Sequence, residues 1–262
     1  RETLLRRTYL RVAEAISDRQ VPLGQRDDLV LANSKWSAAQ LAEHFGVMES
    51  PVLYPPVVLP TAPTNSKRDP LGFVCLGRIV PEKEVERIIR ILERVRKEGY
   101  AVNLRLIGEL DETPYGSRIG SLIDRHDWIR PEGFLQLEAK QEILASQTYA
   151  LHACRIEAFG IAVAEMASLG CVPIVPDSGG AREIVPPEEL HFGSDEEACA
   201  KIIRLLKRPE LLPALREELS LGVSRFGPEV FQRELRSHLR QFAGLKKPSP
   251  HADSEKNLAT SL

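Results

Sequence analysis

The sequence predicts an α/β fold built on a doubly wound parallel sheet, and two observations carry the prediction. Beyond residue 70, short apolar runs alternate with amphipathic helical patterns, which is typical of a parallel sheet with helices on both faces. The chain has 262 residues with 43% hydrophobic and 27% charged side chains, as in an ordinary globular protein with a sizeable core.

Each element follows from its own pattern. Apolar runs predict strands at 71–76, 102–107, 128–129, 149–152 and 172–175. The spacing of Val85, Ile88, Ile89, Leu92 and Val95 predicts a helix over 84–97 with one buried side. Further helices are predicted at 118–125, 137–146, 195–207 and 210–222, with a short one after Gly180 and a last amphipathic one ending near residue 242.

The stretch before residue 57 reads as a separate unit. It contains a predicted amphipathic helix at 2–17, strands at 29–34 and 52–54, and a helix at 36–45 with Ser34 as its N-cap. Pro, Thr, Asn and Ser then form a linker up to Pro70. We therefore predict four parts: 1–56, a sheet domain at 57–226, a crossing helix at 227–244 and a disordered polar tail at 245–262.

Composition indicates the kinds of partner and the cellular compartment to expect. The net charge of −2 gives no reason to expect nucleic acid as a partner. Cys75 and Cys171 lie in apolar runs, which indicates buried thiols in a reducing compartment. No apolar run is long enough to cross a bilayer. We expect a protein of the cytosol or of the cytosolic face of a membrane.

The segment around Glu157 and Glu165 is the most informative part of the chain. Seven residues separate the two carboxylates, and the intervening Phe159, Gly160 and Ile161 open a predicted helix whose free N–H groups favour an anion. Carboxylates accept hydrogen bonds from hydroxyls, so the pair suits a ligand with phosphates and polyols, such as a nucleotide-sugar. A solvated helix start would explain the spacing equally well, but the small, apolar residues at 158–171 indicate burial.

Two turns add candidate phosphate contacts. Gly77 to Lys83 follows a predicted strand, where α/β proteins bind ligands, and Arg78 and Lys83 can reach a pyrophosphate. A turn with two solvated cations is the alternative, and spacing alone does not separate the two. Gly179 and Gly180 form a second turn after a strand, of a kind common in any fold.

Together these motifs resemble those of glycosyltransferase family 4, retaining transferases with two facing Rossmann-like domains (GT-B). The family carries Glu-x7-Glu, a small-residue helix, a Gly-Gly loop and a Gly-Arg-hydrophobic-x-Pro-x-Lys turn. The resemblance implies that Arg78 and Lys83 bind the donor diphosphate and that Glu165 binds the ribose. It also implies that Glu157 contacts the transferred sugar as the catalytic residue. The other implied donor contacts are Phe159, Gly160, Ile161, Gly179 and Gly180, with Glu183 a weaker candidate, and no cofactor or metal is required.

One branch of the family matches more closely. His152, the run 32–37 and the run 54–57 resemble the α1,2-mannosyltransferases that extend dolichol-linked oligosaccharide from GDP-mannose. The resemblance implies a glycan or lipid-linked glycan acceptor. The charges of Arg6, Arg7 and Arg11 favour peripheral membrane contact, although packing of that helix on another domain explains its amphipathic pattern as well.

The resemblance also limits the expected activity. Residues 1–56 resemble only the last elements of the family's amino-terminal acceptor domain, without its glycine-rich loop. We therefore keep a nucleotide-sugar-binding module without catalysis as an alternative to a transferase. A sugar-phosphate epimerase, which can share the two-domain architecture, is a second alternative.

Overall fold

The computed structural model describes residues 22–58 and 67–245. The predicted helix at 2–17, with its three arginines, most of the predicted linker and nearly all of the predicted tail lie outside these residues.

The sheet domain contains one parallel sheet with the strand order β3-β2-β1-β4-β5-β6. Neighbouring strands pair in parallel throughout, for example Val74 of β1 with Arg105 of β2 and with Ala150 of β4. This confirms the α/β fold class. The strands are β1 (Asp69–Leu76), β2 (Asn103–Ile107), β3 (Ile129–Gly133), β4 (Gln147–Leu151), β5 (Val172–Pro176) and β6 (His191–Phe192).

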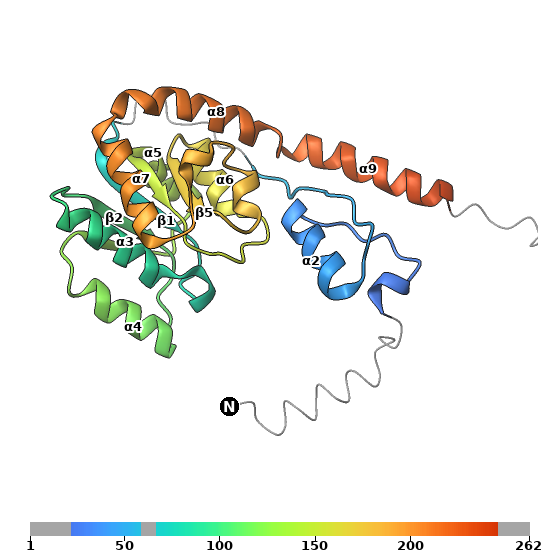
Figure 1. Ribbon diagram of the computed structural model, residues 1–262, viewed down its shortest axis with the longest axis horizontal. Coiled ribbons are helices and arrows are strands. Elements are labelled where there is room, and N and C mark those ends of the chain that lie inside the picture. The colour runs from blue at the N-terminus through green and yellow to red at the C-terminus, as the bar shows by residue number, and fades with distance from the viewer. Residues whose placement is uncertain (1–21, 59–66, 246–262) are drawn as a thin grey trace, which may run out of the picture.

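Helices cover both faces of the sheet (Figure 1). Helix α3 packs against α7, and α6 packs against α8. The helices of the domain are α3 (Val85–Lys97), α4 (Pro114–Ile123), α5 (Leu137–Ser146), α6 (Ile161–Ser168), α7 (Asp195–Lys207) and α8 (Leu212–Ser224). Short 3-10 turns are η1 (Leu23–Gln25), η2 (Pro81–Lys83), η3 (Gly180–Glu183), η4 (Glu188–Leu190) and η5 (Pro209–Leu211).

Helix α3 shows how the sequence pattern becomes packing. The five apolar residues that predicted this helix are each at most 1% exposed, so the predicted stripe is the buried face. Arg87 is also buried, and its Nε donates to Asp195 Oδ1 of α7 at 2.6 Å. Burying a charge requires such a partner, and this pair fixes α3 against α7.

Several element predictions need correction. Helix α4 begins at Pro114 rather than 118, because the Thr113 side chain accepts from Gly116 N and proline suits the first helical position. The predicted strands at 29–34 and 52–54 are not strands, since only Ala32 and Val52 form a single parallel bridge. The short helix predicted after Gly180 is the 3-10 element η3. Strand β6 has only two residues and was not predicted.

The segment before the sheet domain contains α2 (Lys35–Phe45), with Ser34 as the N-cap as predicted. This helix lies against η3 of the sheet domain. After α8 the chain continues into α9 (Pro228–Leu245), which extends away from the sheet (Figure 1).

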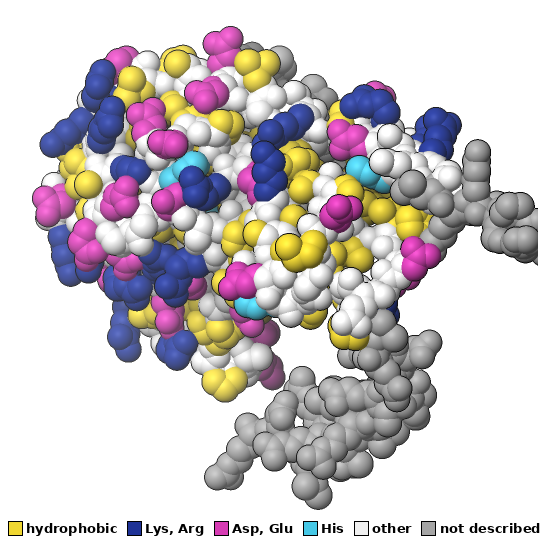
Figure 2. Space-filling model, turned by 45° about the vertical axis from the view of Figure 1, so that its right-hand side comes forward, with side chains coloured by type: hydrophobic (Ala, Val, Ile, Leu, Met, Phe, Trp, Pro, Cys, Tyr) yellow, Lys and Arg dark blue, Asp and Glu magenta, His cyan; other side chains and the backbone are white. Residues whose placement is uncertain are grey.

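All four cysteines are free thiols. Acidic and basic side chains are interspersed over the face shown in Figure 2, in keeping with the net charge of −2. Among the residues that the structure describes, no helix has both the length and the apolar composition needed to cross a bilayer.

Candidate functional site

The candidate site lies where the strand order reverses. β1 and β4 are neighbours in the sheet, although two strands and their helices separate them in the chain. The loops that leave two such strands run to opposite faces and open a crevice at the carboxyl edge, where α/β proteins bind ligands. Here the loop after β1 carries Arg78 and Lys83, and the loop after β4 carries His152 and Glu157.

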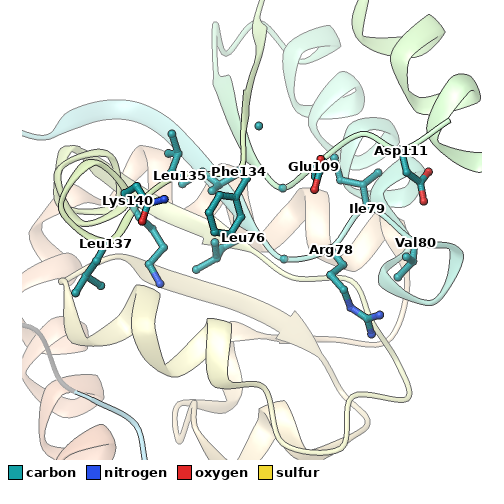
Figure 3. Close-up of a pocket in the computed structure, with 15 residues that line it drawn as sticks. Leu76, Arg78, Ile79, Val80, Glu109, Asp111, Phe134, Leu135, Leu137 and Lys140 are labelled. Carbon is teal, nitrogen blue, oxygen red and sulfur yellow. The ribbon is translucent and has the colours of Figure 1, made fainter.

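A cavity of about 590 Å³ opens beside this point, in the size range of small-molecule sites (Figure 3). Its walls are the turns after β1, β2 and β3 together with Lys140 of α5. Figure 3 shows Arg78 and Lys140 extending from opposite ends of the cavity to the same side of it. Phe134, which is 75% exposed, offers a free aromatic face at the rim.

The cavity floor depends on a close approach of two backbones. Gly77 has φ 148° and donates its N–H to Ile107 O at 3.0 Å. A Cβ on Gly108 would lie 2.1 Å from Gly77 O, so only glycine fits there. The turns after β1 and β2 are therefore held side by side. Arg78 is the next residue after Gly77, so this contact fixes the position of its backbone.

Each carboxylate of the Glu157/Glu165 pair has a lysine partner. Lys83 Nζ is ion-paired with Glu157 Oε2, and Lys140 Nζ lies 2.7 Å from Glu165 Oε2. Glu165 lies in the second turn of α6, while Glu157 is in the loop before it. The structure thus brings together Lys83 and Glu157, which come from the loops after β1 and β4.

His152 lies next to Glu157 of this pair. Its Nε2 is 3.5 Å from Glu157 Oε2, and the side chain is 7% exposed. Burial lowers the pKa of His152 to about 4, the nearby Glu157 carboxylate raises it, and the Lys83 ammonium lowers it. The imidazole is therefore neutral at neutral pH.

His152, Cys154 and Glu157 also have a spacing that could hold a metal ion, because their ligand atoms lie within 4.8 Å of one another. The Lys83 ammonium is ion-paired with Glu157 Oε2. A positive charge beside these ligand atoms opposes cation binding.

The Gly179–Gly180 turn contacts the Glu157 loop rather than the 590 Å³ cavity. Gly180 N donates to Glu157 O at 2.7 Å. A Cβ on Gly180 would lie 2.2 Å from Ala158 O. Gly179 lines a separate hollow with Lys35 and Trp36. The glycines therefore hold the backbone of the Glu157 loop.

Glu183 fixes α2 to the sheet domain. Its carboxylate accepts the N–H groups of Lys35 at 3.1 Å and Trp36 at 3.0 Å, and the Tyr54 hydroxyl at 2.7 Å. These bonds satisfy the free N–H groups of the first turn of α2. Glu183, considered as a weaker donor contact, is occupied by this structural role.

Ser34 completes the same contact. Its hydroxyl accepts from Ser37 N at 2.9 Å and donates to Ala158 O at 2.5 Å. The carbonyls of Glu157 and Ala158 are thus bonded by η3 and by α2, and the loop that carries Glu157 is held from both sides.

The three residues at the start of α6 have different surroundings. Phe159 is 2% exposed and packs edge-on against Phe226, with ring centroids 5.0 Å apart. Gly160 has φ 105° and allows the chain to enter the helix. Ile161 is 47% exposed at the first position of α6. Of the three, Ile161 has its side chain open to a ligand, whereas Phe159 belongs to the core.

Some cavity residues escaped the sequence reasoning, namely Glu109, Asp111, Phe134, Leu137 and Lys140. The sequence did indicate where these residues would lie, because the segments that follow β2 and β3 must reach the same edge of the sheet as Gly77. Their residue types form no recognisable motif.

Comparison with known proteins identifies the family. Residues 61–220, more than half of the chain, match the family described as Glycosyl transferases group 1. The chain belongs to this family. The family resemblance drawn from Arg78, Lys83 and the two glutamates is thereby confirmed.

Individual relatives of this glycosyltransferase group 1 chain are distant. A protein from Neurospora crassa named GDP-Man:Man(3)GlcNAc(2)-PP-Dol alpha-1,2-mannosyltransferase is 23% identical, over 86% of this chain and 47% of its own length. The Phosphatidylinositol N-acetylglucosaminyltransferase GPI3 subunit of Saccharomyces cerevisiae is 28% identical, over 49% of this chain and 29% of its own length. The chain thus spans less than half of these relatives. The Neurospora match supports the predicted branch.

Solved structures share the fold. Sucrose-phosphate synthase from Thermosynechococcus elongatus superposes with a TM-score of 0.72 at 18% identity, over 91% of this chain and 62% of that one. Anabaena HepE in complex with UDP and glucose superposes with a TM-score of 0.70 at 19% identity, over 89% and 67%. The GT-B expectation for the sheet domain is confirmed at the level of fold.

Proposed function

We propose that this chain is the donor-binding part of a retaining glycosyltransferase that transfers a sugar from a nucleotide-sugar to an acceptor hydroxyl. One observation carries the proposal. A cavity of nucleoside size, with Arg78 on its wall, opens next to a lysine–glutamate pair that bridges the β1 and β4 loops. The cavity, the cations for the phosphates and the carboxylate for the sugar hydroxyls are therefore adjacent. They follow the order of nucleoside, diphosphate and sugar in a nucleotide-sugar.

The proposed chemistry needs positive charge at the leaving group. As the bond from the anomeric carbon to the diphosphate breaks, its electron pair passes to a phosphate oxygen, and Arg78 and Lys83 stabilise that charge. The acceptor hydroxyl forms the new bond on the face that the diphosphate leaves and passes its proton to the departing phosphate oxygen. Glu157 orients the sugar through its hydroxyls, and Glu165 accepts from the ribose. Two cations and backbone N–H groups serve this role without a metal ion.

The names of relatives and of solved structures suggest a donor and an acceptor. The Neurospora relative is named for GDP-mannose and a dolichol-linked acceptor, and HepE was solved with UDP and glucose. The branch resemblance favours GDP-mannose and a lipid-linked glycan. Contact with a membrane would involve Arg6, Arg7 and Arg11, which lie outside the described residues.

A second candidate is a nucleotide-sugar-binding module without catalysis. The contacts described at the crevice would serve the binding of a nucleotide-sugar alone as well as its transfer. Transfer activity of the chain alone, assayed with radiolabelled donor and a glycan acceptor, separates the two candidates.

Calorimetry with GDP and UDP tests the proposed diphosphate site. Arg78→Ala removes a charge-assisted contact, so we expect binding to weaken by roughly 1.5–3 kcal/mol. Arg204→Ala on α7, outside the residues that line the cavity, is the matched control and should bind as the wild type does. Equal affinity of the Arg78 variant and wild type would reject the assignment.

A further inference from the structure

One buried nitrogen in the site has no partner. His152 Nε2 makes no hydrogen bond within the described residues, although the side chain is only 7% exposed. An unpaired buried polar atom costs the free energy of its lost hydration. A second state of the site in which this nitrogen gains a partner would recover that free energy.

The nearest candidate partner is already taken. Glu157 Oε2 lies 3.5 Å from His152 Nε2, which is too long for a good hydrogen bond, and the same oxygen is ion-paired with Lys83. The Lys83 side chain is 25% exposed, and a lysine can swing on its flexible stem. The ion pair is therefore the part of the site that can open.

A diphosphate would compete for Lys83. It carries more negative charge than one carboxylate, and Arg78 on the same turn would help to hold it. Once Lys83 turns to the phosphate, Glu157 would be left at 15% exposure without its cation. A carboxylate in that position needs a replacement donor.

We propose that His152 is a positioning residue that takes over the Glu157 carboxylate, through its Nε2–H, when a donor diphosphate draws Lys83 away. The inference rests on the proposed function, since it requires a diphosphate ligand. Before binding, Lys83 holds Glu157; after binding, His152 holds it in place to meet the sugar hydroxyls.

The protonation state of the ring agrees with this role. The pKa of His152 is lowered to about 4, chiefly by burial, so the ring is neutral at neutral pH and can donate one N–H without adding a charge. The charged groups that face it are Lys83, which lowers its pKa, and Glu157, which raises it. Loss of Lys83 from the pair should therefore raise the pKa of His152.

Binding of matched ligands tests the exchange of partners. His152→Leu removes the N–H, while His152→Gln places an amide N–H near the position of Nε2. We expect His152→Leu to bind GDP-mannose or UDP-glucose about tenfold more weakly, whereas affinity for GDP or UDP changes less than about twofold. His152→Gln should recover most of the loss. Equal losses for both ligands, or no recovery by His152→Gln, would overturn the inference.

A titration tests the same contact without any ligand. The proton NMR signal of His152, assigned by its absence in His152→Gln, should titrate at higher pH in Lys83→Met than in the wild type. Lys140→Met is the matched control, because that lysine pairs with Glu165 instead, and the midpoint should not move. An unchanged midpoint in Lys83→Met would contradict the proposal. A wild-type chain that binds no nucleotide would reject the proposed function and the exchange with it, whereas nucleotide binding together with equal losses for both ligands in His152→Leu would reject the exchange alone.

Discussion

The burial of His152 predicts how the free energy of unfolding of the chain changes as the pH is lowered. The pKa of His152 is about 4 in the folded chain and about 6.5 in the unfolded one. Above the unfolded value both states are neutral, and His152 has no effect on the pH dependence. Between the two values the unfolded state binds the proton and the folded state does not, so stability falls as the pH falls.

The size of this loss of stability follows from the difference between the folded and unfolded pKa values of His152. Each pKa unit corresponds to about 1.36 kcal/mol. Protonation of His152 in the unfolded state should therefore lower the unfolding free energy by about 2 kcal/mol at pH 5 and by about 3 kcal/mol at pH 4. Other groups also titrate in this range, including His191, whose pKa is lowered mainly by burial. The comparison with His152→Gln cancels their contributions.

Urea denaturation at pH 7.5, 6, 5 and 4 measures the prediction. The unfolding free energy of His152→Gln should fall less steeply with acid, and its difference from the wild type should change by the amounts above. His44→Gln, at an exposed position near the end of α2, is the control and should not reproduce this divergence. Parallel curves for wild type and His152→Gln would refute the burial argument.

Two further variants test the contacts that hold the Glu157 loop. Ser34→Ala loses an N-cap and the bond to Ala158 O, so urea denaturation should show a loss of about 1–2 kcal/mol, with Ser34→Thr restoring most of it. Unchanged stability of Ser34→Ala would argue against this contact. Gly180→Ala places a Cβ 2.2 Å from a backbone oxygen and should cost at least about 2 kcal/mol, while Gly120→Ala, with open space in α4, should be neutral or stabilising. Similar thermal midpoints for the two alanine variants would contradict that geometry.

Much of the fold follows from local patterns. The apolar stripe of α3 is set by residues within one helix. Each parallel strand is a short apolar run with a turn on either side. The meeting of Lys83 and Glu157 also follows from sequence, because both residues come after strands that must share one edge of a parallel sheet.

Other features depend on contacts between distant residues. Glu183 bonds the first turn of α2 and Tyr54, which lie more than 100 positions away in the chain, and no local pattern announces that partner. The role of Gly180 depends on where the Ala158 carbonyl lies. Strand β6 has two residues, which are too few to show a periodic pattern in the sequence. The prediction of a strand at 29–34 was wrong because an apolar run forms a strand only where a neighbouring strand pairs with it, and here a single bridge forms.

In the proposed site Glu157 binds the sugar and Glu165 binds the ribose of the nucleotide. Calorimetry of Glu157→Gln and Glu165→Gln, each with free nucleoside diphosphate and with intact nucleotide-sugar, separates these two roles. We predict that Glu165→Gln weakens both ligands by roughly 1–3 kcal/mol, because the ribose is common to them. Glu157→Gln should leave the diphosphate nearly unchanged and weaken only the intact donor. A loss of diphosphate affinity in Glu157→Gln as large as its loss of donor affinity would contradict the account.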